Sequence, residues 1–180
     1  MEKLTIEQLA PYAFNGIKFI SELDKPYDEF GRQRIWTCDG VNKIFGDYCI
    51  TTKENNDAYP IHLCKLIVRS LSDLTKEITH NGETFVPMEK LCNDFCGRTP
   101  CNAEFGTTKI LMHADNGSAL KWWFVYHRNK MTFELSDDNK DMTTHVLPQY
   151  QMFQKLHEWH FDVFGLIDKG LAVDCNTINK

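Results

Sequence analysis

The chain has 180 residues, of which 42% are hydrophobic and 25% charged, and its formal net charge is −5. This composition excludes a disordered chain, and the length suits one domain that buries a core without disulfide bonds. The acidic balance argues against a protein that neutralises nucleic-acid phosphates over a broad surface.

The cellular compartment is predicted from cysteines and hydropathy. Seven cysteines, an odd number scattered along the chain, are more typical of reduced thiols than of a disulfide framework. The first residues lack the pattern of a secretory signal, and the apolar run WWFVY (122–126) is far shorter than the roughly 20 residues of a membrane span. We therefore expect a cytoplasmic protein without a membrane partner.

The first third of the chain predicts a short helix followed by a small antiparallel meander. The T-x-x-Q spacing at 5–8 is typical of a capping box at a helix start. Residues 17–21 have the composition of a strand. Residues 34–52 predict β-structure that turns at Asp39–Gly40 and breaks again at Gly46–Asp47.

The middle of the chain contains the clearest local signal. Residues 58–78 have helical composition, whereas Asn81–Gly82 lies between two β-prone runs and predicts a hairpin. A helix is expected over 87–96, opened by its proline and closed by Gly97. An irregular stretch is expected from about 98 to 108.

The last third predicts a hairpin within 118–135 and then an acidic loop. From Pro148 we expect a long helix that runs to Gly165 or Gly170, and 171–176 could add a strand. Hairpins and separate helices without regular βαβ alternation favour the α+β class, with small antiparallel sheets packed against several helices.

The domain organisation follows from length and the absence of internal repeats. We predict a single domain over 1–180, with a subdivision considered near 97–108.

The segment LHEWHFDVFGLIDKGLA (156–172) places two histidines beside carboxylates and raises the hypothesis of a metal or catalytic helix. In the zinc-protease pattern H-E-x-x-H the histidines are four apart, whereas here they are three apart, and Glu158 would point about 160° away from His160. The same projection puts Trp159 and His160 on the apolar face and Asp162 outside it. We therefore predict structural roles for Trp159 and His160, the latter hydrogen-bonded to backbone or to a polar neighbour.

A zinc site is the second candidate. Cys92, Cys96 and Cys101 with His113 could supply four ligands, although no C-x₂-C pair occurs. Because Cys92 and Cys96 are four apart on a predicted helix, buried free thiols are the favoured alternative, and no cofactor is predicted.

Carboxylates and nucleophiles give weaker signals. Acidic residues around the central hairpin and at 137–141 could hold a catalytic metal but are more often solvated. There is no G-x-S-x-G elbow and no Walker loop.

Aromatic residues suggest a candidate interface. Neighbours in a strand point to opposite faces, so Trp122 and Trp123 cannot both enter one core, and Trp122 with Tyr126 could form an exposed stripe. Phe161 lies on the far side of the predicted helix and would contact another part of the chain or a partner. The alternative is that helices cover both faces of the sheet.

Three blocks carry a family resemblance: LTIEQLAPY (4–12), SLSDLTKEITHNGETFVP (70–87) and EWHFDVFGLIDKGLA (158–172). Because of these three blocks, the chain resembles an uncharacterised family of small proteins from phages and prophages of Bacteroidetes. The resemblance implies a mobile-element origin and the cytoplasm of a bacterial host, but no reaction, cofactor or catalytic residue.

Three functions follow as hypotheses. The first is a non-enzymatic accessory protein that binds another protein of host or phage, of which an inhibitor of host defence would be one version. The alternative is an enzyme acting on nucleic acids or nucleotides through a Cys/His or carboxylate metal site. The second alternative is a homo-oligomeric structural component.

Overall fold

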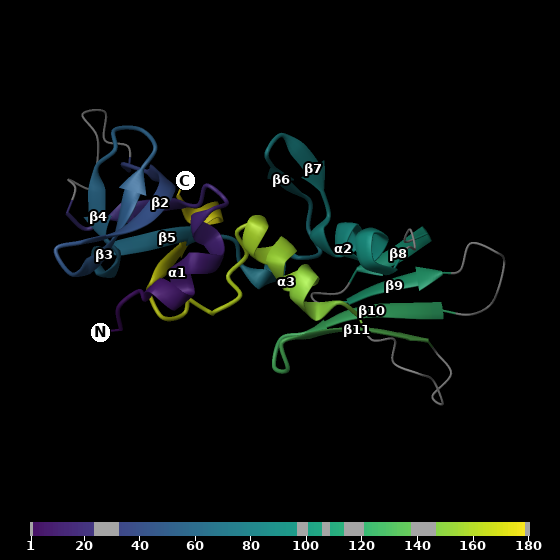
Figure 1. Ribbon diagram of the computed structural model, residues 1–180. Coiled ribbons are helices and arrows are strands. Elements are labelled where there is room, and N and C mark those ends of the chain that lie inside the picture. Colours follow the sequence, from purple (N-terminus) through teal and green to yellow (C-terminus); the bar gives the residue numbers. More distant parts are fainter. Residues whose placement is uncertain are drawn as a thin grey trace. The chain divides into compact units, whose positions relative to one another are not determined.

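The computed structural model describes residues 2–23, 33–96, 101–105, 109–113, 121–137 and 147–178. The chain divides into two compact units: unit 1 comprises 1–70 and 156–180, and unit 2 comprises 71–155 (Figure 1). Both units combine helices with mainly antiparallel strands, so the fold is α+β as predicted. The expectation of a single domain stays a prediction.

Unit 1 is built on a six-stranded sheet with the order β12-β5-β1-β2-β3-β4, in which only the β12–β5 pair is parallel. The core joins α1 to this sheet, because buried Leu9 and Tyr12 cluster with buried Phe19 and Leu66. The elements of unit 1 are α1 (Ile6–Ala13), β1 (Lys18–Ser21), β2 (Trp36–Ile44), β3 (Asp47–Thr52), β4 (Ala58–Pro60), η1 (Ile61–Leu63), β5 (Cys64–Val68), β12 (Ala172–Asp174) and η3 (Cys175–Thr177).

Unit 2 contains a four-stranded antiparallel sheet, β11-β10-β9-β8, and a separate β6–β7 hairpin. Aromatic rings of the sheet and of α3 pack together: the Phe133 ring centroid lies 4.8 Å from that of Tyr126 and 5.5 Å from that of Phe153 on α3. The elements that begin in unit 2 are η2 (Leu71–Asp73), β6 (Ile78–His80), β7 (Glu83–Phe85), α2 (Pro87–Cys96), β8 (Cys101–Phe105), β9 (Lys109–His113), β10 (Lys121–His127), β11 (Thr132–Asp137) and α3 (Gln149–Glu158).

Gln149, the first residue of α3, hydrogen-bonds to the main chain of the edge strand β11. The Phe133 N–H donates to Gln149 Oε1 at 2.7 Å, and Gln149 Nε2 donates to the Phe133 carbonyl at 2.7 Å. Both main-chain groups of Phe133 therefore have a partner although β11 ends the sheet.

Several local predictions are confirmed. Gln8 Oε1 accepts a hydrogen bond from the Thr5 N–H at 3.0 Å, which is the reciprocal half of a capping box. Asn81 and Gly82 adopt φ angles of 50° and 84° and form the β6–β7 turn. α2 has the predicted bounds, and hairpin β10–β11 and strand β12 are also present.

The prediction of a helical segment over 58–78 is wrong. This stretch forms β4, η1, β5 and η2, and β5 lies inside the sheet between β1 and β12. Its residues Leu66, Ile67 and Val68 are all buried. A continuous apolar run is typical both of a buried helix and of a strand covered on both faces, and the sequence signal cannot separate them.

Two smaller predictions are also wrong. β2 continues through Asp39–Gly40 with only a register irregularity, and the turn lies at Phe45–Gly46, beside the second predicted break. An Asp-Gly pair suits a bulge as well as a turn. The stretch expected to be irregular up to 108 contains β8, which pairs with β9.

The long C-terminal helix is the largest error, because α3 ends at Glu158. His160 has a φ of 62°, its N–H donates to the His157 carbonyl at 3.0 Å, and the Phe161 N–H donates to the Leu156 carbonyl at 2.8 Å. These two bonds form a Schellman-type helix end, with histidine where glycine is usual. Arg69 then exchanges backbone hydrogen bonds of 2.8 Å with His160 and Asp162, so the chain pairs with the end of β5 and leaves the helix.

Within the described residues, no helix combines the length and apolar character that crossing a bilayer requires.

Candidate functional site

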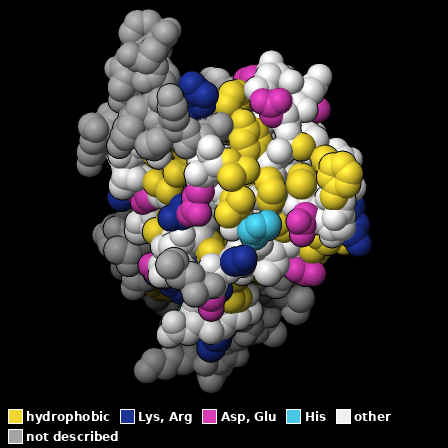
Figure 2. Space-filling view, turned by 90° about the vertical axis from the view of Figure 1, so that its left-hand side faces the viewer, with side chains coloured by type: hydrophobic (Ala, Val, Ile, Leu, Met, Phe, Trp, Pro, Cys, Tyr) yellow, Lys and Arg dark blue, Asp and Glu magenta, His cyan; other side chains and the backbone are white. Residues whose placement is uncertain are grey.

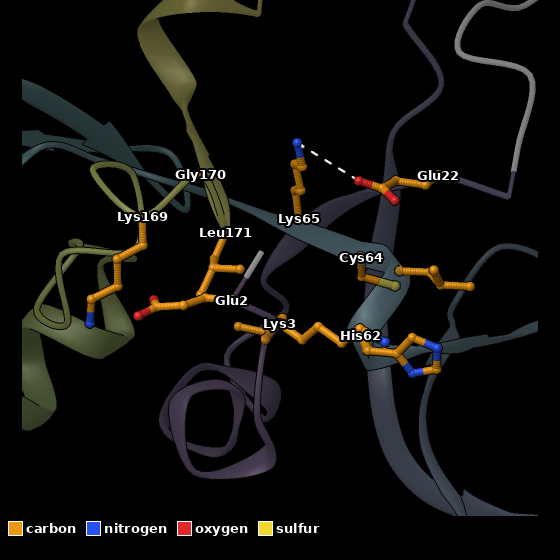
Figure 3. Close-up of a pocket in the computed structure, with 11 residues that line it drawn as sticks. Glu2, Lys3, Glu22, His62, Cys64, Lys65, Lys169, Gly170 and Leu171 are labelled. Carbon is orange, nitrogen blue, oxygen red and sulfur yellow. Dashed lines mark ion pairs between the residues drawn. The ribbon is translucent and has the colours of Figure 1, made fainter.

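Unit 1 contains a pocket of about 650 Å³, shown in Figure 3. Its walls come from residues 2–4 before α1, Glu22 after β1, residues 62–65 of η1 and β5, and residues 169–171 before β12. Such a volume suits a small molecule, so the lining side chains decide what the pocket can do.

The charged groups of this pocket do not converge on one point. Lys65 Nζ lies 3.8 Å from Glu22 Oε1, and Lys169 Nζ donates to a backbone carbonyl at 3.0 Å. In Figure 3 the Lys3 side chain extends toward His62, whereas Lys65 and Lys169 extend in other directions. Because the ammonium groups are dispersed and partly committed, this arrangement does not favour an anion site.

Two thiols of unit 1 hydrogen-bond to backbone carbonyls. The Cys64 thiol, at the pocket wall, donates to the Pro60 carbonyl at 3.3 Å, and the Cys38 thiol donates to the Ala13 carbonyl at 3.5 Å. Burial raises the pKa of Cys38 to about 11 and also raises the pKa of Cys49. A nucleophilic cysteine needs the opposite shift, so Cys38 and Cys49 are not activated.

The predicted zinc ligands are only partly placed. On α2, Cys92 is buried and Cys96 is half-buried, and the β8–β9 register sets Cys101 opposite His113. The side chains of Cys101 and His113 lie outside the described residues. Among the side chains that are described, no three of the types His, Cys, Asp and Glu form a group that could hold a metal ion. The zinc site stays a hypothesis, and the favoured alternative of free thiols without a cofactor stays a prediction.

The predicted aromatic stripe of β10 faces its own unit. Trp122, Phe124 and Tyr126 alternate along the strand and are all buried, while Trp123 on the other face is half-buried. This burial corrects the expectation of an exposed Trp122–Tyr126 stripe, because the rings of Phe133 and Phe153 pack against Tyr126. An interface role for Trp123 stays a prediction.

The predicted C-terminal residues are embedded in unit 1. Phe161 is fully buried within unit 1, so it makes the expected contact with another part of its own chain and is not an exposed interface residue, and its carbonyl accepts a hydrogen bond from Tyr12 Oη at 2.8 Å. Trp159 is buried. His160 Nε2 lies 2.9 Å from the Asn15 carbonyl and, since a carbonyl only accepts, must carry the proton.

Asp162 is buried, which corrects its expected position outside the apolar face. Its carboxylate accepts hydrogen bonds from the Leu166 N–H at 2.6 Å and the Ile167 N–H at 2.9 Å. The neighbouring Val163 N–H donates to Tyr12 Oη at 3.3 Å, and burial raises the pKa of Tyr12 above its ordinary range. These hydrogen bonds hold the turn after α3.

His157 is the unusual member of this segment. Its ring meets Tyr12 edge-on at 5.0 Å and stacks on Phe164 at 5.5 Å between ring centroids. Within the described residues its Nε2 is buried and has no hydrogen-bond partner. Burial also lowers the pKa of His157 below its ordinary value of about 6.5.

The stability of the chain should therefore fall on acidification. Above about pH 6.5 His157 is neutral in both the folded and the unfolded state. Below that pH the unfolded state binds a proton first, which stabilises it relative to the folded state. We expect urea unfolding, followed by circular dichroism at about pH 7.5 and about pH 5.5, to show a lower midpoint at the acidic pH. The difference should shrink in His157→Gln, and an unchanged difference would contradict the assignment.

The distal part of the β2–β3 hairpin is the remaining candidate site. None of the residues from 39 to 48 is buried. Phe45 and Gly46 form the turn with φ angles of 51° and 96°, and the Phe45 side chain is fully exposed. Exposed Tyr48 lies beside it on β3, with Lys43 Nζ 5.7 Å from its ring centroid.

Sequence reasoning placed a second break at Gly46–Asp47, beside this tip, but gave Phe45 no role. The local signal was Gly46 between two β-prone runs, since glycine accepts a positive φ.

No family model, curated protein or solved structure matches this chain.

Proposed function

We propose that this chain is a phage- or prophage-encoded accessory protein that acts in the cytoplasm of a bacterial host by binding another protein. It would do so without catalysing a reaction itself. Support comes from the three sequence blocks at 4–12, 70–87 and 158–172, from the acidic net charge of −5, and from the exposed surface of unit 1. Inhibition of a host defence system is one form that such binding could take.

The observation that carries the proposal is the set of large hydrophobic side chains that unit 1 exposes. Phe14, Leu23, Phe45 and Tyr48 have exposed fractions of 89%, 61%, 104% and 43%. Figure 2, which looks onto the end of unit 1 drawn with β3 and β4, shows hydrophobic side chains gathered among acidic and basic ones. Exposed apolar groups with a polar surround are typical of protein interfaces.

The test is reconstitution of a complex. Tagged full-length chain would be purified from the bacterial host, each co-purifying protein identified, and the pair rebuilt from separately purified components. We expect one protein to bind at a fixed stoichiometry with a Kd at or below about 1 μM, measured by calorimetry.

Other outcomes would favour the alternatives. Stoichiometric metal in protein purified without chelators would favour the metal enzyme. A defined homo-oligomer in light scattering, with no second protein bound, would favour the structural component.

A further inference from the structure

The turn of the β2–β3 hairpin carries an aromatic side chain, Phe45, that is not buried and therefore adds no hydrophobic stabilisation to the fold. A turn with positive φ at both central positions accepts Asn or Gly, whereas a bulky residue in the left-handed region is strained. Phe45 adopts φ 51° at this position and is fully exposed, so no burial offsets the strain.

The chain itself contains the matched comparison. The β6–β7 turn has nearly the same backbone, with φ angles of 50° and 84°, and uses Asn81 followed by Gly82. The two turns differ in having Phe or Asn at the first central position. Asn is less strained than Phe in this conformation, so the stability of the hairpin gives no reason for Phe at position 45.

We propose that Phe45 is an anchor that inserts into an apolar pocket of a partner protein. This inference rests on the protein-binding function proposed above and names the surface that performs it. An aromatic side chain has only two side-chain torsions to restrict, so it loses little conformational freedom on binding, which is typical of interface residues that contribute most to affinity.

The charges around the tip identify the class of partner. Residues 42–48 carry one cation, Lys43, and one anion, Asp47, and both are exposed. A lipid surface or a nucleic acid would be recognised by clustered basic residues, which this tip lacks. A protein pocket with an apolar floor and a rim bearing charges of both signs fits Phe45, Lys43 and Asp47 together.

The variant that tests the proposal is Phe45→Asn, which gives this hairpin the Asn-Gly turn of β6–β7. Its thermal unfolding midpoint should equal or exceed that of the unchanged chain, so that any loss of binding cannot be ascribed to misfolding. Tyr150→Asn is the matched control, because Tyr150 is also a highly exposed aromatic residue but lies on α3, outside the set of exposed side chains named above.

Binding is measured with the reconstituted partner of the preceding section. We expect Phe45→Asn to weaken the Kd at least about tenfold and Tyr150→Asn to change it less than about twofold. A photoreactive phenylalanine analogue at position 45 should form an adduct with that partner, and the same analogue at position 150 should not.

Each contrary outcome is distinct. If the partner binds Phe45→Asn as tightly as the unchanged chain, the anchor is overturned while the proposed function stands. If no partner can be reconstituted, the proposed function fails first. A lower unfolding midpoint for Phe45→Asn, or Phe45-dependent binding to vesicles of phosphatidylglycerol and phosphatidylethanolamine instead of a protein, would overturn the anchor as well.

Discussion

Replacing Trp159 with Ala is expected to lower the free energy of unfolding by about 3–5 kcal/mol. Trp159 follows the last residue of α3, and only 2% of its surface is exposed. Removal of the indole loses its transfer free energy and leaves a cavity that neighbouring side chains fill only in part. The loss can be measured from the midpoint and slope of urea unfolding followed by circular dichroism.

Tyr150→Ala provides the control, because Tyr150 is an aromatic residue of α3 but is exposed. Its removal should change stability by no more than about 0.5 kcal/mol. If Trp159→Ala unfolded at the same urea concentration as Tyr150→Ala, Trp159 would not be part of the core.

Replacing Asp162 with Ala should cost about 2–4 kcal/mol of unfolding free energy. Its buried carboxylate accepts hydrogen bonds from the backbone N–H groups of Leu166 and Ile167. Without the carboxylate, the N–H groups of Leu166 and Ile167 would lose their acceptor, and Leu166 is fully buried. A buried donor without a partner costs about 1–3 kcal/mol. The same urea unfolding measurement applies.

Asp168→Ala is the matched control, because Asp168 is an exposed carboxylate of the same loop. We expect it to change stability by less than about 0.5 kcal/mol. Asp162→Asn should fall between the two, since the amide keeps one acceptor oxygen. Equal stability of Asp162→Ala and Asp168→Ala would show that the two hydrogen bonds contribute nothing.

Features that depend on neighbouring residues were predictable. The Asn81–Gly82 turn and helix 87–96 rest on the φ preferences of Asn, Gly and Pro, which act within a few residues. β5 was mistaken for a helix because its apolar run suits either structure, and its place between β1 and β12 depends on residues more than 40 and more than 100 positions away.

The end of α3 shows how a long-range contact overrides local pattern. The apolar periodicity of the sequence continues past Glu158, but the backbone of His160 and Asp162 pairs with Arg69 instead. The angular projection therefore misplaced Asp162, which is buried. The candidate site at Phe45 was hidden for the same reason, since its exposure follows from how far the hairpin extends beyond the core.

The side chain of Gln149 has a consequence for how copies of this chain meet. Among the described strands β11 ends its sheet, and a strand in that position can recruit a strand of another molecule through its unpaired main chain. The Gln149 side-chain amide offers one donor and one acceptor, and it hydrogen-bonds to both the N–H and the carbonyl of Phe133. At Phe133 the side chain of Gln149 thereby takes the place that a strand of another molecule would need, in a β-prone sequence that would otherwise favour aggregation.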